Sequence, residues 1–436
     1  MTSQLRAYIA TPKRFYTSEW LRWAWERNGG TIAPDASSAD VVLLSLQDVA
    51  DVPFLHSTRE AISRLRRRPL LVCGGLQAWT GNGAALAYAD AVVVGEGSEW
   101  IRTACEQGLD AACSLPCVVT RSDPWRQVTP SRELDLVAAP VVQVNACGWY
   151  ALAGRGCHNK CAFCATSWST PYVTAPRAHL ERLRDTVAAI PKASLTYITN
   201  DSDGIDLHTS VAQSMTVKDY LRLSGQVKAP LIRLGVEGLS EQRRHWFGKP
   251  ISDDDLRRAY DTAGRSGQAL HVFMIVGDPA DADALRHYVR NVLPFTADKR
   301  PELWHKWTMF QPCAFTPLWT FDCRTLVEWE RELAFRECTG RCRRYRDYRA
   351  SSVAVAIHRA AMSRVLWEHV GLVRQPKPRE SASAYCEAMR ARGLDYAVTP
   401  TARDRLPGSQ VEMETARARD AAADRKGLPA LRRDVT

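Results

Sequence analysis

The sequence lacks an apolar run long enough to cross a membrane, which needs about 20 mainly apolar residues in a row. Its first residues lack the charged and then apolar pattern of a secretory signal peptide. Cysteines paired at the spacings of a disulfide framework are also lacking, although the 436 residues include 13 cysteines. These absences exclude a helical membrane protein and a small secreted scaffold, and we expect a cytoplasmic protein with reduced thiols and no membrane partner.

The densest group of cysteines is Cys157, Cys161 and Cys164, spaced C-x3-C-x2-C directly after an apolar, strand-like run at 149–153. Three thiolates leave one iron of a four-iron cluster open, whereas clusters that only carry electrons normally have four cysteine ligands. The spacing therefore indicates a cluster that binds an exchangeable ligand. The alternative is a structural zinc site with His158 or a remote cysteine as fourth ligand, although zinc ligands usually come in two separated pairs.

Strand-like runs alternate with amphipathic helical stretches after the cysteine loop, as a β/α barrel requires. The runs at 194–199, 231–236 and 270–276 are followed by polar or glycine residues, which are Asn200 and Asp201, Glu237, and Gly277. Parallel sheets bind ligands at the carboxyl ends of their strands. A late strand carries Trp304, His305, Lys306 and Trp307, which either line a substrate pocket or pack between barrel and helices.

The first 115 residues predict an open, doubly wound α/β domain. Its expected strands are at 5–10, 41–46, 70–73 and 91–94, and its expected helices are at 18–28 and 51–67. Glycines follow the later strands, at 74–75 and at Gly95 and Gly97, where the backbone must turn or approach a ligand.

The cysteine loop and the segments after it resemble the radical SAM enzymes, in particular those with a cobalamin-binding domain. The resemblance rests on Arg233-Leu-Gly-Val-Glu237, Gly248-Lys249-Pro250, Phe273-Met-Ile-Val-Gly277 and Phe310-Gln-Pro312. It implies an α/β protein, with an N-terminal doubly wound, cobalamin-binding-like domain followed by a partial TIM-type (β/α)6 barrel and a helical C-terminal region. The expected boundaries are 1–115 for the first domain, 116–140 for a linker, 141–325 for the barrel, 326–400 for the helical region and 401–436 for a disordered charged tail.

The resemblance also implies cofactors and site residues. Cys157, Cys161 and Cys164 would hold a [4Fe-4S] cluster, which passes one electron to S-adenosylmethionine (SAM) and splits it to methionine and a 5′-deoxyadenosyl radical. The expected SAM contacts are Phe163, Asn200, Asp201, Glu237, Ile275 and Gly277. The sequence departs from the family in lacking Gly-Gly-Glu after the second strand, and no acid or base catalyst is assigned. The expected electron donor is a flavodoxin- or ferredoxin-like protein.

Cobalamin is the less favoured cofactor on the sequence. The usual Asp-x-His-x-x-Gly signature places a histidine after the first strand, but this chain has Thr11-Pro-Lys-Arg-Phe15 there. The first domain contains one histidine, His56. Because a fold alone does not carry a function, we favour a scaffold domain over a cobalamin site.

The charge of the chain points to the substrate. Its net charge is +10, and one basic cluster, at 341–349, interleaves arginines with tyrosines. Arginine with aromatic side chains suits a phosphate backbone and unstacked bases, so Arg343, Arg344, Tyr345 and Arg346 are candidate nucleic-acid contacts, although a solvated helix face has the same composition.

The predicted function is the rearrangement or modification of a DNA base or modified nucleotide. The reaction that fits best is isomerisation of an amino-acid-modified thymine, glycinylthymidine, as in the radical SAM isomerases of phage thymidine hypermodification, and the protein would then act in the host cytoplasm. The first alternative is a cobalamin-dependent radical SAM methyltransferase acting on a natural product or a peptide. The second is a zinc-stabilised nucleic-acid-binding protein that is not an enzyme.

Overall fold

The structure is a computed structural model of the chain. It describes residues 4–12, 15–47, 51–76, 78, 84–124, 126, 128–143, 148–170, 172–198, 212–277, 281–293, 302–310 and 380–394, with the single positions 354, 357, 373, 376 and 377. No helix in this part of the chain is both long and apolar enough to cross a membrane.

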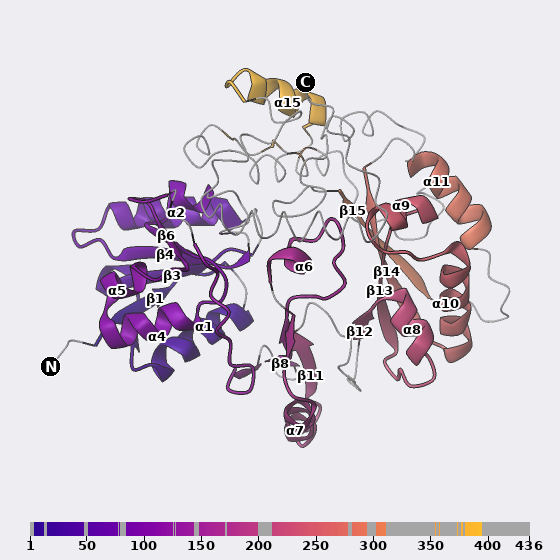
Figure 1. Ribbon diagram of the computed structural model, residues 1–436, viewed down its shortest axis with the longest axis horizontal. Helices are drawn as coiled ribbons and strands as arrows, with labels where there is room; N and C mark the ends of the chain where they lie inside the picture. Colours follow the sequence, from indigo (N-terminus) through magenta and orange to yellow (C-terminus); the bar gives the residue numbers. More distant parts are fainter. Residues whose placement is uncertain are drawn as a thin grey trace.

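The first part of the chain forms a six-stranded sheet with the order β2-β1-β3-β4-β5-β6 (Figure 1). All neighbouring strands are parallel except β5 and β6. The strands are β1 Arg6–Ile9, β2 Thr31–Ile32, β3 Val41–Ser45, β4 Leu70–Gly74, β5 Ala91–Val93 and β6 Val118–Thr120. The first five follow the flavodoxin-like order, whose ligand crevice lies where the order reverses, between β1 and β3.

Helices cover both faces of this sheet because successive strand residues point to opposite sides. On one side of the sheet, Val41 and Leu43 pack with Trp25 and Trp100. On the other side, Val42 and Leu44 belong to a separate core. The helices are α1 Phe15–Arg27, η1 Ala36–Ser38, α2 Val52–Ser63, η3 Ala84–Ala87, α4 Ser98–Gln107 and α5 Leu109–Cys113. The predicted doubly wound domain is confirmed.

The first sheet extends beyond residue 115, where the sequence places the end of the first domain. Strand β6 pairs antiparallel with β5, and Gly95 forms a further bridge with Ser131. The segment 116–140, expected to be a linker, therefore contains an edge strand. That strand satisfies backbone groups of β5 that would otherwise be exposed at the edge.

The second part of the chain begins with a three-stranded sheet of order β11-β8-β7. Its strands are β7 Val141–Gln143, β8 Gly148–Leu152 and β11 Ser194–Ile198, and β8 and β11 are parallel. The helix α7 Arg177–Ala188 connects them in the chain, preceded by the short helix α6 Ala165–Ser169 and the antiparallel pair β9 Gly154–Arg155 and β10 Val173–Thr174.

Four further parallel strands form a sheet of order β12-β13-β14-β15. They are β12 Ala212–Met215, β13 Leu231–Glu237, β14 Ala269–Val276 and β15 Leu303–Met309. β8 and β11 are parallel to each other, and these four are parallel within their own sheet, which gives six strands as the predicted (β/α)6 barrel requires. Residues 199–211 between β11 and β12 lie outside the described part. The sequence reading identified each of these strands except β12.

The helices of this half pack on one face of the four-stranded sheet, with β8, β11 and α6 on the other side (Figure 1). They are α8 Val217–Leu223, α9 Glu241–Trp246, α10 Asp253–Ser266, α11 Asp281–His287 and the π-helical turn η4 Tyr288–Val292. Alternate residues of β14, from Leu270 to Val276, are at most 1% exposed and form the core beneath the helices. The intervening residues face the barrel lumen.

Of the predicted helical region at 326–400, the structure describes the helix α15 Ala382–Arg390. Tyr385 and Met389 of this helix are fully buried and belong to the same core as β13 and β14. The predicted charged tail at 401–436 lies outside the described residues.

Candidate functional site

The three cysteines lie on a tightly turned loop between β9 and α6. Gly156 and Lys160 adopt left-handed backbone conformations, with φ of 69° and 49°. The Cys164 amide donates to the carbonyl of Cys161 at 3.2 Å, and Cys164 immediately precedes α6. Residues with a side chain rarely adopt this conformation. Lys160 is held in it by a hydrogen bond of 2.6 Å from its Nζ to the carbonyl of Ser167. The loop thus folds back on itself and brings the thiols into one region.

The electrostatics of Cys161 show how close the loop lies to the barrel. Cys161 is 4% exposed, and burial raises the pKa of its thiol to about 12, while the ammonium of Lys249 acts in the opposite direction. The negative charges of Cys164, Glu237 and Cys157 also raise the pKa of the Cys161 thiol. Cys157 Sγ accepts bonds from the amide and the side chain of Asn159, each at 3.4 Å.

This donor set fits an iron–sulfur cluster. Soft thiolates select iron–sulfur clusters, and hydrogen bonds to the sulfurs together with a nearby cation stabilise the anionic ligands. Within the described part of the chain, no three histidine, cysteine or acidic side chains are arranged to hold a single metal ion. A cluster does not require that arrangement, because each thiolate binds a different iron.

Direct contacts join the cysteine loop to the segment after α9. The amide of Ala162 donates to the carbonyl of Phe247 at 2.9 Å. The ring of Phe163 packs edge-on against that of Phe247, with centroids 5.2 Å apart, and Lys249 Nζ lies 6.0 Å from the Phe163 ring centroid. The loop is therefore positioned by residues almost 90 positions later in the chain.

Glu237 lies at the carboxyl end of β13, where the strand bulges between Gly235 and Glu237. Its φ of 69° is unusual for a residue with a side chain. Its carboxylate accepts from Lys249 Nζ at 2.8 Å, and the same ammonium donates to the carbonyl of Gly235 at 3.1 Å. A Cβ at Gly235 would meet Lys249 Nζ at 2.6 Å and Glu237 Oε1 at 2.8 Å, so a larger residue there would displace the ion pair. One oxygen of the predicted SAM contact is thus already bonded.

Lys249 was not predicted as a site residue. Its burial alone would lower the pKa of its ammonium, but Glu237 and then Cys161 outweigh burial and raise the pKa. The sequence shows only Gly-Lys-Pro in a loop, and a lysine in a loop is usually solvated. The buried position follows from the contact between this loop and the cysteine loop.

Lys249→Met is expected to lower the free energy of unfolding by about 3 kcal/mol, because Glu237, 9% exposed, would keep a buried charge without its partner. Iron bound after reconstitution should also fall, because a cation beside the thiolates is lost. Thermal unfolding and iron analysis measure the two effects. Lys228→Met, at an exposed lysine, is the matched control, and the double variant with Glu237→Gln should recover part of the lost stability. Unchanged stability in Lys249→Met would show that the pair is not important.

The other predicted SAM contacts have separate positions. Ile275 lies near the carboxyl end of β14, on the lumen side. It follows Met274, the residue of β14 that pairs with Glu237. The amide of Gly277 donates to Asp281 at 2.6 Å, which ties the end of β14 to the start of α11. Asn200, Asp201 and the candidate nucleic-acid contacts Arg343, Arg344, Tyr345 and Arg346 lie outside the described residues.

The late strand divides its four singled-out residues between two environments. His305 and Trp307 are 8% and 6% exposed on the helix side, where Tyr288 and His305 share a hydrogen bond of 2.9 Å. Burial lowers the pKa of His305 to about 4. Trp304 and Lys306 alternate with them and face the lumen.

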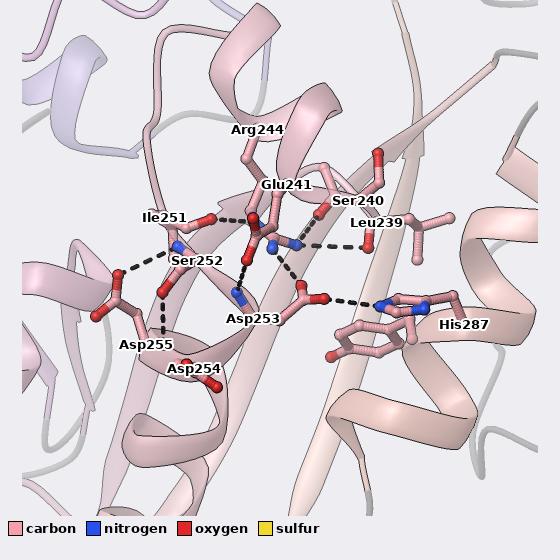
Figure 2. Close-up of polar contacts among 12 residues, drawn as sticks. Leu239, Ser240, Glu241, Arg244, Ile251, Ser252, Asp253, Asp254, Asp255 and His287 are labelled. Atoms are coloured by element: carbon pink, nitrogen blue, oxygen red, sulfur yellow. Dashed lines mark hydrogen bonds and ion pairs between the residues drawn. The ribbon is translucent and has the colours of Figure 1, made fainter.

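A buried ion pair holds the segment that carries Phe247 and Lys249 (Figure 2). Arg244 is fully buried and pairs with Asp253 at 2.5 Å, and Asp253 also contacts His287 at 2.8 Å. The guanidinium further donates to the carbonyls of Ile251, at 2.6 Å, and Gly238, at 3.1 Å. Arg244 therefore links the exit of β13 to the start of α10, and the intervening loop is fixed between them.

The crevice of the first domain supplies no histidine among its described residues. His56 lies on α2, is half exposed, and faces Glu60 and Tyr88. A Cβ at Gly75 would meet the carbonyl of Leu46 at 2.4 Å, so this glycine allows two chain segments to touch. Axial ligation of cobalamin by a histidine does not fit these residues.

No family model and no curated protein matches the chain. Solved structures are similar. TsrM from Kitasatospora setae, a radical SAM methyltransferase with tryptophan and aza-SAM bound, aligns over 96% of this chain and 100% of its own, with 13% identity and a TM-score of 0.56. TsrM with cobalamin and a [4Fe-4S] cluster aligns over 74% and 78%, with 14% identity and a TM-score of 0.55.

OxsB, a cobalamin-dependent radical SAM enzyme with aqua-cobalamin and SAM bound, aligns over 99% of this chain and 82% of its own. Its identity is 11% and its TM-score 0.53. Likeness at these identities concerns the fold. The chain therefore shares the fold of these structures, an open α/β domain followed by a partial β/α barrel.

Proposed function

We propose that this protein is a radical SAM enzyme that cleaves SAM reductively and uses the resulting 5′-deoxyadenosyl radical to rearrange or modify its substrate. The observation that carries the proposal is the position of the cysteine loop. Its thiols lie beside the Glu237–Lys249 pair at the carboxyl end of β13, the end of a barrel strand where ligands bind. The architecture shared with TsrM and OxsB supports the same assignment.

In this proposal Cys157, Cys161 and Cys164 hold the [4Fe-4S] cluster. The bound cluster would supply the electron that breaks the sulfonium bond of SAM, after receiving it from a flavodoxin- or ferredoxin-like donor. The chain positions SAM through the backbone at Phe163 and through the residues at the ends of its strands, which are Asn200, Asp201, Glu237, Ile275 and Gly277. Lys249 holds the Glu237 carboxylate in position through their bond of 2.8 Å.

The test is anaerobic reconstitution with iron and sulfide, followed by reduction with dithionite in the presence of SAM. We expect iron–sulfur charge-transfer absorption and release of 5′-deoxyadenosine, measured by mass spectrometry. Zinc in place of iron and sulfide, with no 5′-deoxyadenosine, would instead favour the zinc-stabilised nucleic-acid-binding protein.

For the substrate, we propose an amino-acid-modified thymine, with isomerisation of glycinylthymidine in phage DNA hypermodification as the reaction. Such a rearrangement needs hydrogen removal by the radical and no methyl donor. The net charge of +10 and the basic segment at 341–349 support a nucleic-acid or nucleotide substrate.

Binding of single-stranded DNA should weaken steeply as salt rises, because each neutralised phosphate releases counterions. Replacing Arg343, Arg344 and Arg346 together by alanine should reduce this salt dependence and leave 5′-deoxyadenosine release without substrate unchanged. Fluorescence anisotropy over a salt series measures the slope. An unchanged slope would count against the basic segment as the contact surface.

The second candidate is a cobalamin-dependent radical SAM methyltransferase in natural-product or peptide modification. It is favoured by the flavodoxin-like order of the first sheet and by the architecture shared with TsrM and OxsB. Cobalt in the purified protein and transfer of a labelled methyl group from SAM to a product would select this function over the isomerase.

A further inference from the structure

The lumen side of the four-stranded sheet carries a group of basic and aromatic residues that the proposed cofactor contacts do not use. Paired residues of β13, β14 and β15 lie side by side at two levels. One level contains Arg233, His271 and Trp304, and the next contains Gly235, Phe273 and Lys306. The second level is nearer to the carboxyl ends of the strands.

Ring contacts link the two levels. The rings of His271 and Phe273 stack with centroids 4.9 Å apart, and Trp304 meets His271 edge-on at 6.3 Å. Lys306 Nζ lies 5.6 Å from the Phe273 ring centroid. The apolar rings of Phe273 and Trp304 thus flank the imidazole of His271, and the ammonium of Lys306 lies beside Phe273.

The cations of this group lack acidic partners within the described residues. Neither Arg233 nor Lys306 forms an ion pair there, and both are exposed on the lumen side. Within β13, β14 and β15, Glu237 is the single carboxylate at a lumen-facing position, and it is bonded to Lys249. Glu302, the residue before β15, accepts a hydrogen bond from Trp304 Nε1 at 2.9 Å. Burial lowers the pKa of His271, and the charges of Arg233 and Lys306 lower it further, so both cations act on one imidazole.

Cations that act on the same imidazole also repel one another, and an anion bound between them removes that repulsion. Arginine binds phosphate and carboxylate groups through paired hydrogen bonds, and an apolar wall strengthens such bonds by excluding water. A few polar groups in an otherwise aromatic pocket are typical of small-molecule sites.

We propose that Arg233, Lys306 and His271 bind the phosphate or carboxylate group of a small substrate inside the barrel, with Trp304 and Phe273 against its uncharged part. The inference rests on the proposed function, which places the radical at the carboxyl ends of the strands. By strand register Glu237 is level with Met274 and Trp307, so Lys306 lies one residue below this level and Arg233, beside His271, lies three residues below it, about 3 and 10 Å at about 3.3 Å per residue. The anionic group is therefore directed away from the reacting carbon.

This depth selects the class of substrate. A base flipped out of DNA enters a pocket while its phosphates stay in the strand. A phosphate bound as deep as Arg233, about 10 Å below the level of Glu237, would then belong to a free nucleotide or to another small anion. In this proposal the substrate is a small anionic molecule, so an amino-acid-modified thymine would react as a free nucleotide and not within a DNA strand.

The experiment is isothermal titration calorimetry of the full, anaerobically reconstituted chain with SAM present. The probes are two pairs, thymidine 5′-monophosphate with thymidine, and indole-3-acetate with indole. At least one anion should bind at least tenfold more tightly than its neutral partner, and the preferred anion distinguishes a phosphate from a carboxylate. Lys306→Met and Arg233→Met should each weaken that anion roughly 10- to 100-fold, as expected for a hydrogen bond to a charged group, with little change for the neutral partner.

Lys218→Met, which removes a lysine from the exposed side of α8, is the matched control and should bind as the wild type does. Lys306→Gln provides a second variant if Lys306→Met unfolds. Anions that bind no better than their neutral partners, or unchanged binding in both lumen variants, would overturn the proposal. So would a thymidine oligonucleotide that competes for the lumen site. Release of 5′-deoxyadenosine without substrate is measured separately, so its absence would refute the radical SAM function and leave the anion site testable by binding.

Discussion

Replacing Cys157, Cys161 or Cys164 by alanine is expected to abolish both cluster binding and SAM cleavage. In the proposed [4Fe-4S] cluster each thiolate is one of only three protein ligands, so its loss leaves an iron without a protein ligand. Iron bound after reconstitution should fall close to background, and 5′-deoxyadenosine should become undetectable. Iron and sulfide analysis, visible absorption and mass spectrometry of the reduced reaction measure these losses.

Cys105→Ala is the matched control for these variants. Cys105 is half-buried on α4, and its thiol lies 3.9 Å from the carbonyl of Trp25, far in the chain from the cysteine loop. This variant should keep its iron and its activity. Circular dichroism should show that all four single variants remain folded, because alanine is tolerated in place of a small buried thiol. A triple variant of Cys157, Cys161 and Cys164 that still releases 5′-deoxyadenosine would refute the cluster assignment.

Arg244→Met is expected to lower the free energy of unfolding by about 3 to 5 kcal/mol, the usual cost of removing one partner of a buried ion pair. Asp253 would lose its main partner, and the carbonyls of Gly238 and Ile251 would lose donors. Because Phe247 and Lys249 lie in the segment that Arg244 holds, cluster retention should fall as well. Urea denaturation measures the stability, and hydrogen exchange of α9 and α10 locates the loss.

Arg257→Met provides the comparison for Arg244→Met. Arg257 pairs with Asp254 at 2.8 Å, but their side chains are 43% and 77% exposed. An exposed pair contributes about 0 to 1 kcal/mol, because solvent screens the charges. Both variants replace an arginine by methionine in neighbouring segments of the chain. The difference between their losses in free energy of unfolding therefore measures the effect of burying the ion pair. Equal effects would contradict the role assigned to Arg244.

The same ion pair predicts a loss of stability in acid. Burial alone would raise the pKa of Asp253, but the bonds from Arg244 and His287 outweigh it and hold the pKa below its ordinary value. Since the folded-state pKa lies below the unfolded one, the stabilisation is complete above about pH 4 and is lost as the pH falls through the folded-state value. The stability difference between the wild type and Asp253→Asn should therefore shrink in acid, as urea denaturation at several pH values would show.

Much of the architecture could be predicted because it depends on patterns within a few residues. Apolar strands alternating with helices identified the doubly wound domain and all but one of the barrel strands, and the prediction of fold class is confirmed. Strand β12 Ala212–Met215 was missed because none of its four residues is β-branched or aromatic. Strand β6 fell in the expected linker because its β-branched run, Val118–Thr120, is only three residues long.

The site was predicted less completely. The cysteine spacing identified the loop, and Glu237 was singled out by its place after a strand, but its bonded partner Lys249 comes 12 residues later with helix α9 between them. Arg244 had no distinguishing signal, because an arginine on a short helix is normally exposed. Its burial follows from how α9 packs between β13 and α10 (Figure 2).

The sequence by itself determined the order of strands and helices, the three-cysteine loop and the polar ends of the strands, since each is written in neighbouring residues. Tertiary structure alone decided which charges are paired. Lys249 and Arg244 are bonded, whereas Arg233 and Lys306 face the lumen without acidic partners among the described residues. Strand register assigns Arg233 and Lys306 to the lumen side of the sheet. The packing of α9 and the loop after it buries Arg244 and Lys249, and both register and packing depend on contacts between distant segments of the chain.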